Sequence, residues 1–141
     1  MEKIVSVNVI NHKLALKAAD ATVAKGSELG CSIAVAIVGP AGELIAFLQA
    51  NGTPLPSAKI AQDKAYSAAS FGIPTPQLYE MVSGNPALRD GLMSQPGIAM
   101  FGGGLPIEIN GEFVGAIGVS GSTEEQDIEC ATAGLASIGA K

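Results

Sequence analysis

Aromatic residues and positive charges are scarce in this chain of 141 residues. Aromatic side chains make up 4% of the sequence, Trp is absent, and 13 acidic residues against 8 Lys and Arg give a net charge of −5. Nucleic acids and anionic membrane surfaces attract clustered positive charge, so we expect neither as a partner. Hydrophobic residues still make up 48% of the sequence, which is enough to bury a core. We expect one domain over residues 1–141.

Long apolar runs and clusters of metal-binding residues are also missing. The longest apolar candidate is interrupted at residues 39–43, and no apolar segment typical of a secretion signal opens the chain. These absences predict a cytoplasmic protein. Cys31 and Cys130 lack CxxC spacing and are expected to be free, buried thiols. No spaced group of His, Cys and carboxylates predicts a metal site.

Helical and strand-like periodicities alternate along the rest of the chain. We expect helices at 8–29, 57–71, 77–82 and 122–138 and strands at 32–38, 43–49, 97–100, 105–109 and 112–120. Residues 83–96 are expected to form a long loop, with at most one helical turn. The pair Asn110 and Gly111 favours a type I′ turn between the last two strands. Short connections between strands predict an α+β domain, with an antiparallel sheet of about five strands covered by helices on both faces.

Lys64 is the charged residue with the most informative position. It lies four residues from both Ile60 and Ala68, on the stripe of helix 57–71 that is expected to face the core. A buried ammonium without a partner is costly, so Lys64 must either reach solvent or find a partner. That partner could be Asp127, a backbone carbonyl, or the carboxylate of a bound ligand.

Glycines form two further candidate features. Gly102, Gly103 and Gly104 lie between two expected strands, where they allow a ligand or another segment to approach the main chain closely. They could line the rim of a pocket or form a tight corner; no GK[ST] follows them, so they are not a phosphate loop. Gly118 and Ala116 give strand 112–120 a face of small residues, which favours close packing of a helix.

His12 is the only histidine in the chain. Its expected position near the start of a helix predicts an exposed side chain, and a lone exposed histidine is usually inert. Imidazole is also the commonest protein ligand of haem iron. His12 is therefore the candidate for an axial ligand.

Four stretches of sequence together resemble the GlcG/HbpS family, also called the haem-degrading or DUF336 domain. They are IAQDKAYSA at 60–68, FGGGLPI at 101–107, GEFVGAIGVSG at 111–121 and EQD at 125–127. In order and spacing they are similar to the family pattern IAxxKAxxA, GGGxPI, (D/N)GxxxGAIGVSG and ExD. The resemblance implies a profilin-like α/β/α sandwich around a five-stranded antiparallel sheet, and a homo-oligomer built from dimers. Some members of the family bind haem.

The first functional hypothesis that follows is haem binding, with storage, slow degradation or redox sensing of haem as its purpose. The only imidazole, that of His12, would ligate the iron. Lys64 or Arg89 would meet the haem propionates.

The second hypothesis is an enzyme that acts on a small carboxylate-bearing metabolite. Lys64 would serve as anion clamp or as acid and base. The glycines at 102–104, with Ser120 and Gly121, would offer backbone N–H donors to the ligand. A third possibility is an oligomeric accessory protein without a ligand of its own.

Overall fold

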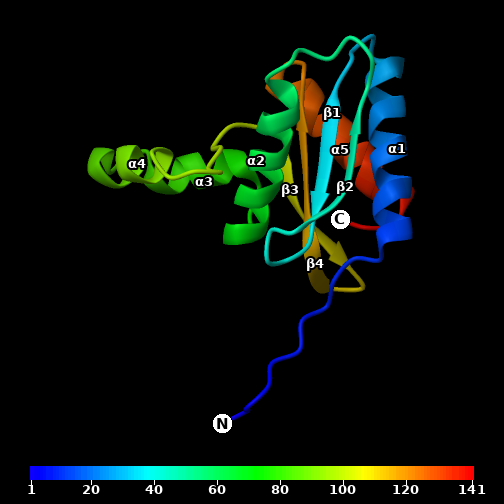
Figure 1. Ribbon diagram of the computed structural model, residues 1–141. Helices are drawn as coiled ribbons and strands as arrows, with labels where there is room; N and C mark the ends of the chain where they lie inside the picture. The colour runs from blue at the N-terminus through cyan, green and yellow to red at the C-terminus, as the bar shows by residue number, and fades with distance from the viewer.

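Four antiparallel strands form one sheet, and helices pack against both of its faces (Figure 1). The computed structural model describes residues 1–141. Its elements are α1 (His12–Glu28), β1 (Ala34–Val38), β2 (Leu44–Gln49), α2 (Ser57–Phe71), α3 (Thr75–Val82), α4 (Pro86–Met93), β3 (Gly104–Ile109), β4 (Glu112–Ser120) and α5 (Glu124–Ser137). None of these helices has the length and apolar character needed to cross a membrane. The fold class is α+β, as the sequence predicts.

The strands are arranged in the order β2-β1-β4-β3. All five residues of β1 are buried, because β1 lies inside the sheet and is covered on both faces, as its continuous apolar run predicts. The turn between β3 and β4 has positive φ angles at both central residues, 54° at Asn110 and 79° at Gly111. This confirms the predicted type I′ turn.

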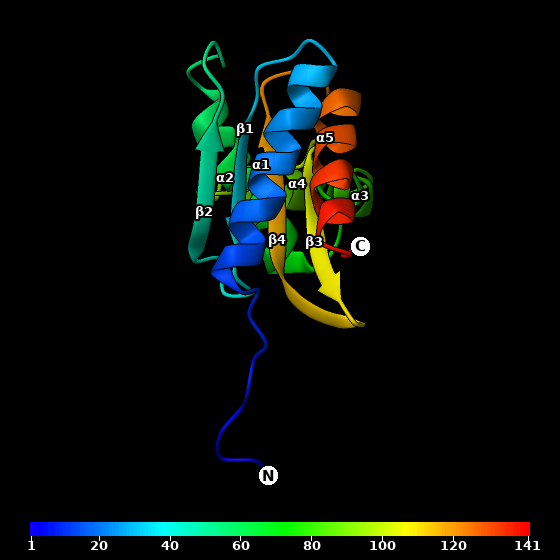
Figure 2. The same ribbon diagram turned by 90° about the vertical axis from the view of Figure 1, so that its right-hand side faces the viewer.

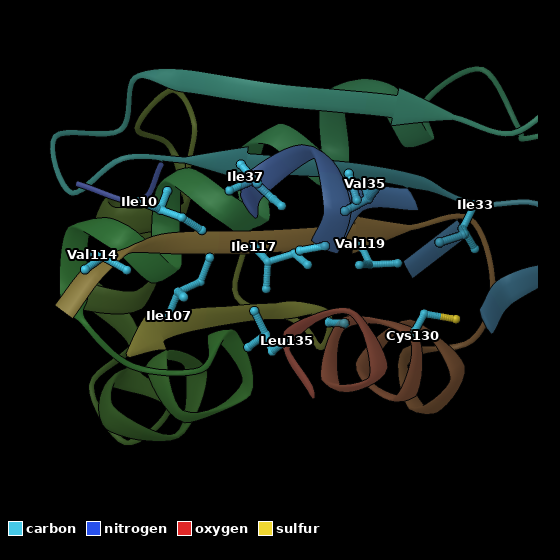
Figure 3. Packing of buried hydrophobic residues seen from close by; sticks show 14 residues of the cluster. Ile10, Ile33, Val35, Ile37, Ile107, Val114, Ile117, Val119, Cys130 and Leu135 are labelled. Carbon is cyan, nitrogen blue, oxygen red and sulfur yellow. The ribbon is translucent and has the colours of Figure 1, made fainter. Parts of the chain in front are cut away.

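The two faces of the sheet carry different cores. α1 and α5 pack side by side on one face, and α2 covers the other (Figures 1 and 2). Under α1 and α5, larger aliphatic side chains such as Ile37, Ile117 and Leu135 form the main cluster (Figure 3). Under α2 the core is built almost entirely from alanines. The scarcity of large side chains there requires backbones to approach closely.

Gly118 is the point where α2 comes closest to the sheet. A Cβ atom at this position would lie only 2.5 Å from the backbone nitrogen of Ala65 and would also overlap the carbonyl oxygen of Ala61. Only glycine allows this contact. The close helix packing that the small residues of this strand favour is therefore confirmed.

The expected fifth strand at residues 97–100 is wrong. Gly97 has a φ of 83°, and the side chain of Ser67 in α2 holds the segment instead. The Ser67 hydroxyl donates to the carbonyl oxygen of Gly97 at 2.9 Å and accepts from the N–H of Ala99 at 2.8 Å. The segment thus bonds to a helix rather than to a strand, and the sheet has four strands.

Residues 83–96 contain a two-turn helix, α4, where a loop was expected. Asn85 caps this helix by accepting from the N–H of Leu88 at 3.2 Å, and Pro86 occupies its first turn, where a missing N–H costs nothing. α3 and α4 together project away from the sheet (Figure 1).

Both terminal helices begin later than expected. α1 begins at His12, because Asn11 caps it by accepting from the N–H of Lys13 at 2.8 Å. Residues 1–9 instead form an extended segment that leads away from the sheet (Figures 1 and 2). α5 is capped by Thr123, whose hydroxyl accepts from the N–H of Gln126, rather than by Ser122.

Candidate functional site

Lys64 is enclosed by three parts of the chain. Its side chain is 1% exposed, and its Nζ donates to the carbonyl oxygen of Val119 at 2.8 Å and to Oδ2 of Asp127 at 3.2 Å. The Nζ also lies 4.7 Å from the centroid of the Phe101 ring, within the range of a cation–π contact. The ammonium group therefore has a carboxylate, a carbonyl and an aromatic face around it.

Asp127 completes this buried group from the other side of the sheet. It lies in the first turn of α5, and its Oδ1 accepts from the N–H of Ser122 at 3.1 Å. Burial lowers the pKa of Lys64 and raises the pKa of Asp127, and in each case the opposite charge of the partner counteracts the shift. The ion pair connects α2 to α5 past the end of β4.

Gly103 and Gly104 pack closely against Lys64, whereas Gly102 packs against Glu124 and Ile128 of α5. A Cβ atom at Gly103 would lie 2.8 Å from the Lys64 Nζ, and its φ of 131° also favours glycine. The N–H of Gly102 donates to Oε1 of Glu124 at 2.7 Å, and that of Gly104 donates to Oγ1 of Thr75 at 3.1 Å. These two N–H groups are thus bonded within the chain.

Ser120 and Gly121 lie at the same end of the sheet. Ser120 is the last residue of β4, is 6% exposed, and pairs with Ala34 of β1. Gly121 has a φ of 136° and passes close to the backbone of Ser32. The structure therefore brings Lys64, Gly103, Gly104, Ser120 and Gly121 to one end of the sheet, although none of its five cavities is lined by Lys64. An anion-clamp role for Lys64 stays a prediction.

Arg89 lies apart from this group. It is on α4, the projecting helix, and its Nε lies 3.1 Å from Oδ1 of Asp90. The neighbouring carboxylate raises the pKa of the Arg89 guanidinium above its ordinary value. Arg89 is therefore available at the surface rather than within the group around Lys64.

His12 lies on the opposite face of the sheet from Lys64. It is the first residue of α1 and is exposed, as expected. α1 and α2 are separated by the sheet, and α4 projects beyond α2 (Figure 1). Within one chain, a haem ligated by His12 therefore cannot also have its propionates bound by Lys64 or Arg89.

A shallow groove of about 470 Å³ runs beside His12, between α1 and β2. Its lining residues are Lys13, Leu16, Lys17, Asp20 and Leu48. His12 directly precedes the first of these residues and is one helical turn before Leu16, although it is not itself one of the lining residues. No pattern in the sequence predicts this groove as a site. The spacing of Lys13 and Lys17, four residues apart, was the available signal, but Leu48 comes from a distant part of the chain.

Comparison with known proteins supports a family assignment. Residues 10–136 match the family described as haem degrading protein HbpS-like. The chain belongs to this HbpS-like family. The resemblance given by the four motifs is thereby confirmed.

Two curated relatives of this HbpS-like chain cover most of its length. An uncharacterized 15.0 kDa protein in the dhaT-dhaS intergenic region of Citrobacter freundii is 33% identical over 128 residues, 90% of each chain. The GlcG protein of Escherichia coli K12 is 32% identical over 111 residues, which are 76% of this chain and 81% of GlcG.

Solved structures of related proteins have the same fold. The ORFY protein of Klebsiella pneumoniae matches with a TM-score of 0.91 and 29% identity, over 99% of this chain and 97% of ORFY. A double mutant of Streptomyces reticuli HbpS matches with a TM-score of 0.85 and 30% identity, over 95% of this chain and 90% of HbpS. The structure of a complex of PduOC with haem matches with a TM-score of 0.84 and 25% identity, over 94% of this chain and 97% of PduOC.

Proposed function

We propose that this HbpS-like protein binds haem in the groove between α1 and β2, with His12 as the axial ligand of the iron. One observation carries the proposal: the only histidine of the chain directly precedes Lys13, the first α1 residue that lines a groove with apolar and cationic side chains. The haem complex of the related PduOC protein supports the choice of ligand.

The residues of the groove fit the chemistry of haem. A haem has a flat apolar body, two carboxylates and an iron that accepts a nitrogen ligand. Leu16 and Leu48 offer apolar surface, Lys13 and Lys17 offer positive charge for the carboxylates, and His12 offers the imidazole. When bound, haem would supply one-electron or oxygen chemistry at its iron.

The positions of the charged side chains along the groove indicate where the carboxylates of a haem would bind. Lys13 and Lys17 are four residues apart on one face of α1, so both ammonium groups can bind carboxylates on the same side of a ligand. Asp20 lies at the far end of the groove and disfavours a carboxylate there. We therefore expect the propionates near the start of α1, on the same half of the helix as His12.

Titration with haemin, followed by difference absorbance in the Soret region, tests this placement. Reversing both charges in Lys13→Glu/Lys17→Glu should weaken haemin binding by about tenfold, the size expected for two exposed ion pairs. The matched control is Lys3→Glu/Lys59→Glu, which has the same net charge but changes lysines outside the groove. Equal affinities of the two double variants would contradict the placement of the propionates.

A further inference from the structure

Residues 1–9 form a strand-like segment without a partner in the chain. Val5, Val7 and Val9 alternate with Ser6 and Asn8, the pattern of a strand with one buried face. Yet these valines are 75%, 62% and 48% exposed. An apolar face of this kind is stable in water only when something covers it.

The backbone of this segment is also unpaired. The first residue with a backbone hydrogen bond is Ile10, whose N–H donates to the carbonyl oxygen of Val114 at 3.0 Å. Among residues 1–9, only the Asn8 side chain forms a hydrogen bond to the rest of the domain: its Nδ2 donates to Oε2 of Glu112 at 3.3 Å. The segment is thus fixed at its base, while its N–H and C=O groups remain free to pair with another strand.

β2 offers an open edge to which such a strand can add. It pairs only with β1, and its sequence LIAFLQ has neither a charge nor a proline to discourage pairing. On the face that carries α2, Leu44 and Phe47 are 51% and 38% exposed, because α2 packs on the other three strands. This edge therefore has an uncovered apolar strip of its own.

The other edge of the sheet is closed. β3 contains Pro106, which has no N–H to donate. Its residue Glu108 exchanges two backbone hydrogen bonds with Lys141, at 3.1 and 3.2 Å. Only β2 can accept an added strand along its length.

We propose that residues 4–9 of one copy of this chain add as a strand to the β2 edge of a second copy. Within one chain the segment leads away from β2, so its own edge is out of reach in this arrangement (Figures 1 and 2). Residues 4–9 match the six residues of β2, and both segments lack charge. Addition of this strand pairs the free backbone groups and brings the valines against Leu44 and Phe47. A reciprocal exchange gives a symmetric dimer.

Disulfide cross-linking between two variants, in each of which one residue is replaced by cysteine, tests the contact. One variant carries Val7→Cys and the other Phe47→Cys, both at the middle of their segments, so the result depends little on register. Under mild oxidation, a mixture of the two should give a disulfide-linked dimer in higher yield than either variant alone. Equal yields overturn the proposal. In a chain with both substitutions, a disulfide within one monomer would show that the segment folds back onto its own β2 and would also overturn it.

Sedimentation velocity over a range of concentrations measures the energetic contribution of the segment. The wild-type chain should dimerise at micromolar concentrations, and Val7→Asp should weaken this dimerisation by at least about tenfold, because it places a charge in the apolar contact. Leu55→Asp is the matched control, since Leu55 is an 88% exposed loop residue outside both segments. Circular dichroism checks that the variants are folded. A monomeric wild-type chain, or a Val7→Asp variant that dimerises as strongly as wild type, overturns the proposal.

Discussion

Lys64 Nζ lies 3.2 Å from Oδ2 of Asp127, and the two side chains are 1% and 3% exposed. The pair joins helices from opposite faces of the sheet. Lys64→Met should therefore lower the free energy of unfolding by about 3–5 kcal/mol, because it leaves the Asp127 carboxylate buried without its counter-charge. Urea denaturation monitored by circular dichroism measures this loss.

The double variant Lys64→Met/Asp127→Leu distinguishes two contributions to the free energy of unfolding. One is the cost of a buried charge without a partner, and the other is the net stabilisation by the ion pair. It should lose less stability than Lys64→Met alone, because no uncompensated charge remains buried. A Lys64→Met variant as stable as wild type would show that the pair does not support the fold.

Gly118 is predicted to be intolerant of even one added methyl group. Gly118→Ala should destabilise the protein by at least about 1–3 kcal/mol, since the new Cβ overlaps the backbone of α2 and must push the helix away. Gly91→Ala is the matched control, because Gly91 lies in α4 with open space around it. That control should be neutral or stabilise by up to about 1 kcal/mol. Thermal unfolding of the two variants distinguishes these outcomes, and a similar effect of both would contradict the close contact.

Cys130 is predicted to make stability fall at alkaline pH. Burial, assisted by the nearby Asp127 carboxylate, raises the pKa of its thiol from 9.0 to about 11. Between these pH values the unfolded chain has released a proton that the folded chain still holds, so the free energy of unfolding decreases as pH rises. Cys130→Ala should reduce this decrease relative to wild type in urea titrations at pH 9 to 11. An unchanged pH dependence would argue that the thiol ionises similarly in both states.

Local sequence patterns predicted most of the fold. The continuous apolar run of β1, the Asn110 and Gly111 turn and the small face at Gly118 each depend on neighbouring residues, and each is confirmed. The prediction of a strand at 97–100 was wrong because the structure of this segment does not depend on neighbouring residues. Its structure is set by Ser67, which is 30 residues away in the sequence and becomes a neighbour only after folding.

The candidate site was predictable only in part. The position of Lys64 on a core-facing stripe indicated that it needs a partner, and Asp127 was one of the alternatives. The choice among them depended on how α2 and α5 meet around β4, which no local pattern specifies. The groove beside His12 was missed because Leu48 joins it from another element.

Haem ligation by His12 is tested most directly by the absorption spectrum of the haemin complex of the wild-type chain and of His12→Ala. The wild-type chain should give a saturable Soret band at one haem per chain. His12→Ala should shift this band and weaken binding by at least about tenfold. Glu28→Ala, an exposed substitution at the other end of α1, should behave as wild type. A linear, featureless rise with the wild-type chain, or identical saturable spectra for wild type and His12→Ala, would contradict this assignment.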